Sequence, residues 1–387
     1  MKRKTVGAFA LVLGAACILL AVWRMSHSGH DPGLAKPADA DTVPGLTIDK
    51  GITVGDPKHF DNLTVFPVYA AVPAHLGSFV TLDTALEAKM AVVREAGSGD
   101  DATANDEGSS ARVDTLVIEN KGDKPIIVLA GTVVTGGKQD RTIAQDFVIP
   151  PGKTTSVAAF CVEQSRWDAN RQGVATGGRF TTLPALANAE VRNAGQFDKD
   201  QTKVWREVAR MNEKNGKKTD TGTLAATLDD VEISKRRDAL AAKAIVHMAQ
   251  QQPTGKVVGL AYGVGGRIHA VRWFMNNELF MLHRDKLLKT AALEAISAQP
   301  ADERQASSDD KRFDKRLSAK DIAEFVASVQ TARAETATER KDDNVRRSYG
   351  NKKGYGWSLD VAASASPKAA EENAPAAPVT KGFRSLL

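Results

Sequence analysis

The chain has 387 residues, and its 42% hydrophobic content is enough to bury a sizeable core in one main domain with flanking segments. Its net charge of +5 is a small excess of 52 basic over 47 acidic residues, and without an RNA- or DNA-binding motif we expect no nucleic-acid partner. Cys161 is the only cysteine outside the N-terminal apolar run, which excludes an internal disulfide or a thiolate metal cluster in the folded part.

The first residues have the layout of an export sequence. Basic residues at positions 2–4 precede an uncharged apolar run, residues 6–23, as in a signal anchor or a signal peptide. We therefore predict that residues 1–26 hold the protein in a membrane through residues 6–23, with its domain outside the cytoplasm, in the periplasm or at the cell surface. Cleavage would instead secrete the domain. Residues 27–45 have no periodicity and are predicted to be a flexible tether.

Strand patterns dominate the first half of the predicted main domain. Strands are expected over residues 113–118, 126–134, 143–149 and 155–162, separated by turns that contain glycine, proline or asparagine. Connections this short favour antiparallel neighbours.

Helix patterns follow. Residues 233–252 carry apolar side chains at helical spacing, a glycine-linked strand pair spans residues 257–274, and Asn276 or Asn277 is positioned to cap another helix. Since strands pair in sequence and helices cluster late, residues 46–300 are predicted to be an α+β domain. We expect a mainly antiparallel sheet with helices packed on it, plus the N-terminal membrane helix.

The C-terminal residues have a different character. Residues 301–361 are predicted to be a charged helical extension, in which Ser318 and Asp321 open a helix that continues through residue 347. Its narrow apolar stripe is a candidate contact for a protein partner. Residues 362–387, rich in Ala and Pro, are predicted to be a disordered tail.

The segment from residue 131 to residue 167 carries the candidate site. Gly136 and Gly137 would turn one strand into the next and leave backbone N–H groups open to an anion. If the strands at 126–134 and 155–162 lie close in one sheet, the polar residues that follow each of them converge. The residues predicted to bind a ligand are Gly136, Gly137, Lys138, Gln139, Arg141, Arg166 and Trp167. A plain exposed hairpin, with Arg166 paired to Asp140 or Glu163 at the surface, is the alternative.

The same segment carries a family pattern. It runs from Leu129-Ala130-Gly131 through Gly136-Gly137-Lys138-Gln139-Asp140-Arg141 and Pro150-Pro151 to Cys161-Val162-Glu163-Gln164 and Arg166-Trp167. This series resembles the core of the ARPP-1 domain family, formerly a domain of unknown function, over about residues 46–300. Ser165 stands where that pattern usually has glycine. The family's name comes from association with ADP-ribosylglycohydrolase and rhodanese-phosphatase proteins, so the resemblance implies a nucleotide or ADP-ribose context.

Three functions are open on this basis. The first is binding of a small anionic or sugar- or nucleotide-type ligand, because the charged and amide groups on a glycine-opened turn complement such a molecule. The second is a hydrolase in which Asp140 and Glu163 form a general acid/base pair. The third is a membrane-anchored scaffold. The seven histidines lack metal-ligand spacing, so no metal site is predicted, and the sequence identifies no cofactor.

Strand parity separates the first two functions. Residues 139 and 141 share one side of a strand, so Gln139 and Arg141 are expected to face Glu163 and Arg166. Asp140 would then point away, which favours binding over the two-carboxylate hydrolase.

Overall fold

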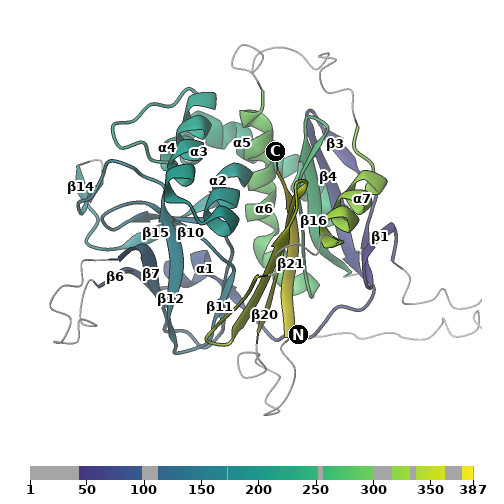
Figure 1. Cartoon of the computed structure of the whole chain (residues 1–387), viewed down its shortest axis with the longest axis horizontal. Coiled ribbons are helices and arrows are strands. Elements are labelled where there is room, and N and C mark those ends of the chain that lie inside the picture. The colour runs from purple at the N-terminus through teal and green to yellow at the C-terminus, as the bar shows by residue number, and fades with distance from the viewer. Residues whose placement is uncertain are drawn as a thin grey trace, which may run out of the picture. The chain divides into compact units, whose positions relative to one another are not determined.

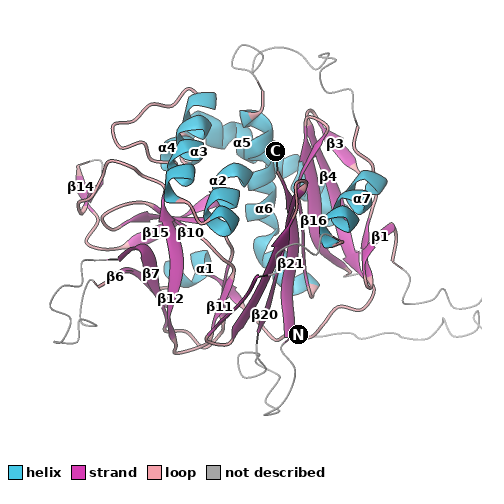
Figure 2. Cartoon of the chain, in the orientation of Figure 1, coloured by secondary structure: helices cyan, strands magenta, loops and turns pink. Residues whose placement is uncertain are grey.

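Two large antiparallel sheets hold most of the strands, with most of the helices gathered between and above them and α7 (Ala319–Gln330) on the far side of the ten-stranded sheet (Figures 1 and 2). This computed structural model describes residues 43–97, 112–171, 173–251, 256–299, 316–331, 337–361 and 377–386. Among the described strands, only β5 (Val80–Thr81) and β8 (Ile126–Val128) pair in parallel. The predicted α+β class with a mainly antiparallel sheet is therefore confirmed.

The predicted membrane helix lies outside the described residues, because residues 6–23 fall before residue 43. In the part of the chain that is described, no helix is long and apolar enough to cross a membrane.

The six-stranded sheet carries the segment that the sequence singled out. Its strands lie in the order β15, β9, β10, β12, β7, β6. Arg141 pairs with Val134 on one side and with Cys161 on the other, which places it inside the sheet. The bounds are β6 (Ala91–Ala96), β7 (Arg112–Asn120), β9 (Thr132–Gly136), β10 (Arg141–Ile143), β12 (Thr154–Cys161) and β15 (Phe180–Leu186).

Two of the predicted strands are each broken in two. Residues 126–134 form β8 and β9, and residues 143–149 contain the end of β10 and all of β11 (Phe147–Ile149), so both cross from a three-stranded sheet into the six-stranded one. At the corner Gly131 has a φ of +90°, and the N–H of Ala130 donates to Asp146 Oδ1 at 2.7 Å. Both halves of each strand are buried, so their hydrophobic pattern runs through the corner without a break.

The ten-stranded sheet corrects the prediction for the C-terminal residues. Its order is β1, β2, β4, β16, β17, β21, β20, β19, β18, with β3 paired to β4, so the last strand lies between β17 and β20 in the middle of the sheet. The helix predicted to reach residue 347 ends at Gln330. The bounds are β1 (Leu46–Asp49), β2 (Ile52–Val54), β3 (Lys58–Phe60), β4 (Leu63–Ala70), β16 (Val257–Val264), β17 (Arg267–Phe274), β18 (Ala337–Lys341), β19 (Asn344–Gly350), β20 (Gly354–Val361) and β21 (Ala377–Ser385).

The charged helical extension and the disordered tail are thus wrong where the chain is described. Residues 337–361 and 377–386 are strands and their ends, while residues 362–376 lie outside the described part. The charged residues there were taken for the solvent-exposed face of a helix. Some of them lie on the mostly exposed edge strand β18, whereas Arg384 on β21 is buried in a polar interior.

The helices cover both faces of the ten-stranded sheet. One core contains α5, α6 and side chains such as Val65, and the other contains α7 and side chains such as Phe66, as expected for neighbours on a strand. The predicted cap of α6 is confirmed, since Asn276 Oδ1 accepts from the N–H of Leu279 at 2.8 Å. The helices are α1 (Leu82–Glu87), α2 (Ala189–Asn193), the π-helical η1 (Ala194–Asp198), α3 (Gln201–Lys214), α4 (Ala225–Leu228), α5 (Val231–Gln250), α6 (Asn277–Ser297) and α7 (Ala319–Gln330).

The apolar stripe of α7 is already used within the chain. Ile322, Val326 and Val329 are fully buried in the core that α7 shares with the ten-stranded sheet. The capping box of Ser318 and Asp321 is present, as predicted.

Candidate functional site

The two predicted polar segments meet around the carboxylate of Asp140, which is fully buried. Arg166 and Arg171 donate to its Oδ1 at 3.3 Å and 3.2 Å, and the Thr223 hydroxyl donates to its Oδ2 at 2.8 Å. Glu163 Oε2 accepts from Arg166 Nε at 2.9 Å and from the backbone N–H of Asp140 at 3.0 Å. These five residues are the Asp140 cluster, which joins the end of β9 to the segment after β12.

Arg166 uses its remaining donors inside the protein. Its Nη1 donates to the carbonyl oxygens of Gly137 and Asp168, both at 2.8 Å, and its Nη2 donates to the carbonyl oxygen of Gly136 at 3.1 Å. A guanidinium has five N–H donors, and these bonds with those to the two carboxylates engage all three of its nitrogens. Arg166 therefore fastens the glycine turn rather than offering a donor to a ligand.

The glycine turn binds the carboxylate of Asp140, an anionic group of the same chain. The N–H of Gly136 donates to Asp140 Oδ1 at 3.1 Å, and the N–H of Gly137 donates to the carbonyl oxygen of Arg179 at 3.2 Å. A Cβ at Gly136 would lie 2.0 Å from that carbonyl oxygen, and one at Gly137 would lie 2.2 Å from the Phe180 ring. The N–H groups expected to be open are occupied, and the glycines are required by the close approach of β15.

Gln139 and Arg141 form a second group beside the cluster. Arg141 Nη1 donates to Gln139 Oε1 at 3.0 Å, and its Nη2 lies 3.8 Å from Glu95 Oε1. The Trp167 ring centre lies 5.5 Å from Lys138 Nζ and 5.7 Å from Arg141 Cζ. These distances suit cation–π contacts.

The prediction from strand parity is right for Gln139 and Arg141, which share one side, and wrong for Asp140. Gln139 and Arg141 do contact each other, but it is Asp140 that bonds to Arg166 and to Glu163 through its backbone. The turn folds Asp140 back over Gly136, which reverses the expected side.

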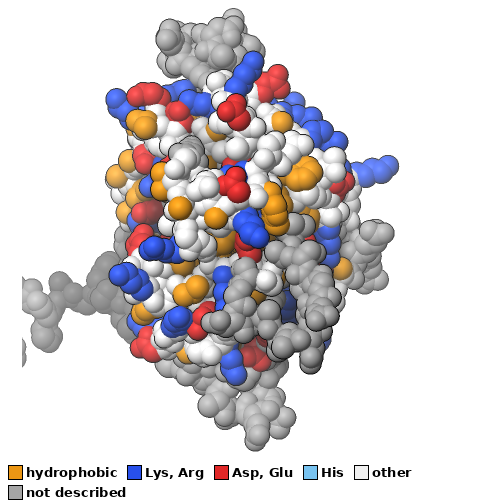
Figure 3. Space-filling view, turned by 90° about the vertical axis from the view of Figure 1, so that its left-hand side faces the viewer, with side chains coloured by type: hydrophobic (Ala, Val, Ile, Leu, Met, Phe, Trp, Pro, Cys, Tyr) orange, Lys and Arg blue, Asp and Glu red, His pale blue; other side chains and the backbone are white. Residues whose placement is uncertain are grey.

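Little of this motif is open to solvent. Asp140 and Glu163 are 0% and 2% exposed and Arg141 is 1% exposed, whereas Trp167 is 46% exposed. On the face of the molecule seen in Figure 3, basic and acidic side chains are interspersed. The predicted site residues therefore come together mainly as a buried, internally paired structure, and neither candidate catalytic carboxylate reaches the surface.

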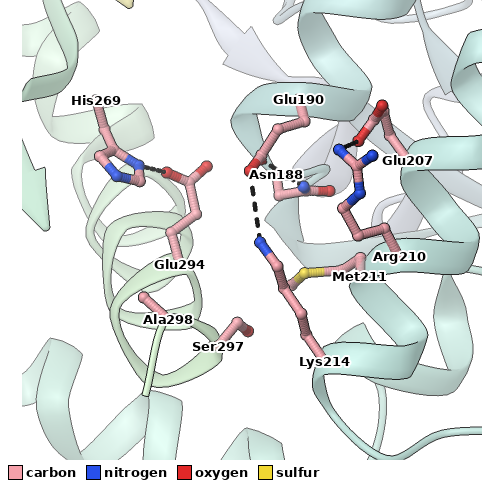
Figure 4. A pocket seen from close by; sticks show the side chains of 10 residues that line it. All are labelled: Asn188, Glu190, Glu207, Arg210, Met211, Lys214, His269, Glu294, Ser297 and Ala298. Atoms are coloured by element: carbon pink, nitrogen blue, oxygen red, sulfur yellow. Dashed lines mark hydrogen bonds and ion pairs between the residues drawn. The ribbon is translucent and has the colours of Figure 1, made fainter. Parts of the chain in front are cut away.

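A cavity opens elsewhere, between α3 and α6 (Figure 4). The space open to the centres of water molecules is about 50 Å³, which is room for a few waters or for one polar group of a larger ligand. Glu207, Arg210 and Lys214 recur along α3 at the spacing of one helix face, opposite Glu294 on α6. The cavity is lined by Asn188, Glu190, Glu207, Arg210, Met211, Lys214, His269, Glu294, Ser297 and Ala298.

Glu294 is the buried centre of a hydrogen-bond network in the cavity wall. Its Oε1 accepts from the N–H of Ala189 at 2.8 Å and from Arg192 Nη2 at 3.0 Å. Its Oε2 accepts from the Tyr262 hydroxyl at 2.9 Å and bonds to His269 Nδ1 at 2.7 Å. Burial alone raises the pKa of Glu294, but the hydrogen bond and charge of His269, with Arg192, lower it to about 2.

The charge of Glu294 fixes the tautomer of His269. An ionised carboxylate only accepts hydrogen bonds, so His269 Nδ1 must carry the proton in that bond. In the neutral ring Nε2 then holds the basic lone pair. His269 lines the cavity and its side chain is 12% exposed, so the ring borders the space that part of a ligand would occupy.

The opposite wall carries the polar side chains of α3 together with Asn188 and Glu190. Lys214 Nζ lies 3.9 Å from Glu190 Oε1, and Arg210 Nη1 donates to Glu207 Oε2 at 2.8 Å. Asn188 donates to Glu190 Oε2 at 2.7 Å, but its buried Oδ1 has no hydrogen-bond partner among the described residues. A buried acceptor without a donor costs free energy, which a ligand hydroxyl or amine would recover.

The family pattern and the cavity are connected through Gly131. A Cβ on Gly131 would lie 2.4 Å from Arg192 Cδ, so the glycine leaves the space that the arginine occupies on its way to Glu294. The sequence analysis missed Glu294 and His269 because they lie 25 residues apart on a helix and a strand. The usable clue was a glutamate at a position that is otherwise apolar in the α6 pattern.

Metal ligation has no support in the described residues, where no group of three or more His, Cys, Asp or Glu side chains could hold an ion. Cys161 is buried, and burial raises the pKa of its thiol although Arg141 lies near it. A protonated thiol is a poor nucleophile.

Comparison with known proteins places this arrangement in a family. Residues 51–363 match the model of the ARPP-1 family, the ARG and Rhodanese-Phosphatase-superfamily-associated Protein domain. No curated protein and no solved structure matches the chain. Since the match covers most of the sequence, the chain belongs to the ARPP-1 family, and the matched region extends beyond residue 300 to include β18, β19 and β20.

Proposed function

We propose that this ARPP-1 family member is an envelope-located domain that binds a small anionic or sugar- or nucleotide-type ligand, one polar group of which enters the cavity between α3 and α6 while the rest lies at its mouth. The observation that carries the proposal is the contrast in access to open space. The Asp140 cluster satisfies its own charges out of solvent, whereas the cavity presents Lys214, Asn188 and His269 to a space of about 50 Å³. The basic start and the apolar run at residues 6–23 support the envelope location.

The lining groups suggest how such a ligand is held. The side chain of Lys214 is 48% exposed where it lines the cavity, so it is suited to an anionic group at the mouth of the cavity. The unpartnered Asn188 Oδ1 and the carboxylate of Glu190 accept hydrogen bonds, which suits sugar hydroxyls.

Titration of the full chain with ribose 5-phosphate, followed by calorimetry, tests this proposal. Lys214→Ala should weaken binding about tenfold, because a hydrogen bond to a charged group contributes roughly 1.5 kcal/mol. Lys203→Ala is the matched control, since Lys203 lies on the same helix with its side chain 42% exposed and pairs with Asp198 instead. Equal effects of both variants, or equal binding of ribose without the phosphate, would contradict the proposal.

A hydrolase is the second candidate, and the 2.7 Å contact between His269 Nδ1 and Glu294 favours it. The carboxylate orients the ring and leaves Nε2 as a general base for a water molecule in the cavity. This moves the predicted acid/base role from Asp140 and Glu163, which are sealed, to a pair that borders open space. His269→Gln should abolish release of inorganic phosphate from ribose 5-phosphate while binding persists. If the wild-type chain releases no phosphate, the hydrolase proposal is wrong and only the binding proposal stands.

A further inference from the structure

A second, smaller cavity lies on the face of the ten-stranded sheet that α6 covers, with a lining separate from that of the α3–α6 cavity. The space open to the centre of a water molecule is about 10 Å³, which is room for one water or one small ion. Leu260, Ala270 and Leu287 form apolar parts of its wall. The complete lining is Arg192, Leu260, Tyr262, Ala270, Arg272, Leu287, Thr290 and Trp357.

The unpartnered polar atoms of this lining are all donors. Arg272 is 3% exposed; its Nη2 donates to Asp146 Oδ2 at 2.6 Å, but its Nε and Nη1 have no partner among the described residues. Arg192 is 5% exposed, and its Nε is likewise unpartnered. The lining hydroxyls are engaged, since Tyr262 donates to Glu294 and Thr290 donates to the carbonyl oxygen of Lys286.

The charge around the cavity is also unbalanced. Three buried arginines lie here, Arg192, Arg272 and Arg384, and the described ion pairs give a buried carboxylate to two of them, Glu294 to Arg192 and Asp146 to Arg272. Arg384 donates to the neutral side chains of two neighbours, Asn193 and Gln196, and no carboxylate pairs with it among the described ion pairs. Burial, with the charges of Arg192 and Arg272, lowers the pKa of Arg384 well below its usual range.

Arginine does not normally lose its proton in proteins, so the excess charge must be met in another way. Ring contacts meet part of it, because Arg272 Cζ lies 5.3 Å from the Phe274 ring centre and 5.6 Å from that of Trp357. Arg346 lies outside the lining: its Nη2 is 3.6 Å from Glu339 Oε2, and its Nε and Nη1 have no partner among the described residues. Unpartnered donors, a net positive charge and a space for one particle coincide between Arg192 and Arg272.

We propose that this cavity is a binding site for one small inorganic anion of halide size, held by the free N–H groups of Arg192 and Arg272. A water molecule would satisfy one or two donors without offsetting the charge, whereas an anion does both. The anion is a structural ligand, independent of the molecule proposed to bind between α3 and α6. Failure of that first proposal would therefore leave this one intact.

The test is thermal unfolding of the full chain in sodium chloride and in sodium gluconate at equal ionic strength, because gluconate is too large for the cavity. Chloride at roughly ten times its dissociation constant should raise the unfolding midpoint by about 2 to 4 °C, and the rise should saturate. Equal midpoints in the two salts at every concentration would overturn the proposal.

Two variants localise the effect. Ala270→Val reduces the cavity while keeping every charge, so the chloride dependence should disappear. Arg346→Met removes a buried arginine outside the lining and should retain it. Chloride dependence that survives Ala270→Val would place the ion elsewhere and overturn the site.

Crystals grown in sodium bromide give a readout that needs no variant. Anomalous scattering should show bromide between Arg192 and Arg272. Density for water alone at that position would overturn the proposal.

Discussion

The Asp140 cluster and the Glu294 network bury similar groups and yet differ in what they can do. Each surrounds a carboxylate with arginine: Asp140 with Arg166 and Arg171, and Glu294 with Arg192. Around Asp140 the remaining partners are a backbone N–H and the hydroxyl of Thr223. Around Glu294 one partner is His269, whose ring borders a cavity.

The difference shows that density of charge in a sequence does not by itself mark a binding site. The polar groups in a run of glycine, lysine, glutamine, aspartate and arginine can bond to other groups of the same chain, where they hold two strand ends together. A site requires in addition a concave space and groups left partly unpaired beside it. The Asp140 cluster fits a structural role, in which it holds two strand ends together. The Glu294 network fits the wall of a binding site.

The largest effect is expected from Asp140→Ala. It leaves the buried Arg166 and the partly buried Arg171 without their shared carboxylate, which should cost about 3 kcal/mol or more of unfolding free energy, measured by denaturant titration. Glu119→Ala is the control, because Glu119 pairs with Lys121 at the surface and should cost at most about 1 kcal/mol. Similar losses of unfolding free energy in the two variants would mean that the Asp140 cluster contributes no more to stability than a surface ion pair.

Arg141→Ala should follow with a loss of about 3 kcal/mol, since Arg141 is 1% exposed and its removal takes the guanidinium away from the buried Glu95 and Gln139. The measurement is again denaturant unfolding. A nearly unchanged free energy of unfolding would mean that Arg141 is available to a ligand, as the sequence alone suggested.

The strand and helix patterns predicted much of this fold, since each reads local periodicity. They gave the antiparallel class, the cap at Asn276 and the glycine-linked pair of β16 and β17. They could not give the place of β21, because its pairing with β17 joins residues more than 100 positions apart. They also ran through the corner at Gly131, where only tertiary contacts with Arg192 and Asp146 explain the break.

The candidate site was predictable to a lesser degree. The convergence of residues 136–141 with residues 163–167 was correctly expected from strand pairing. Their burial was not, because charged residues are mostly exposed and only the folded structure shows that these pair with one another. The Glu294 network left no local pattern, since its members come from β16, β17, α2 and α6.

The next largest effect is expected in the pH dependence of stability, which reports on the Glu294 network. The pKa of Glu294 is lowered to about 2 from an ordinary value of 4.5, so its contribution is complete above about pH 4.5 and is lost as the pH falls towards 2. A shift of this size corresponds to roughly 3 kcal/mol. Denaturant unfolding across this range should show a shallower fall for Glu294→Gln than for the wild type; parallel curves would mean that Glu294 is not the ionised centre of the network.

The smallest effect on stability is expected at the exposed rim of the motif. Trp167 is 46% exposed and contacts Lys138 and Arg141 through its ring, so Trp167→Ala should cost about 1 kcal/mol or less. Because Trp167 does not line the α3–α6 cavity, the variant should also bind ribose 5-phosphate as the wild type does. The matched comparison is Lys214→Ala, which should lose affinity with little change in stability, since the Lys214 side chain is half-exposed. If affinity falls in Trp167→Ala and holds in Lys214→Ala, the ligand lies on the motif and the assignment of the two regions is reversed.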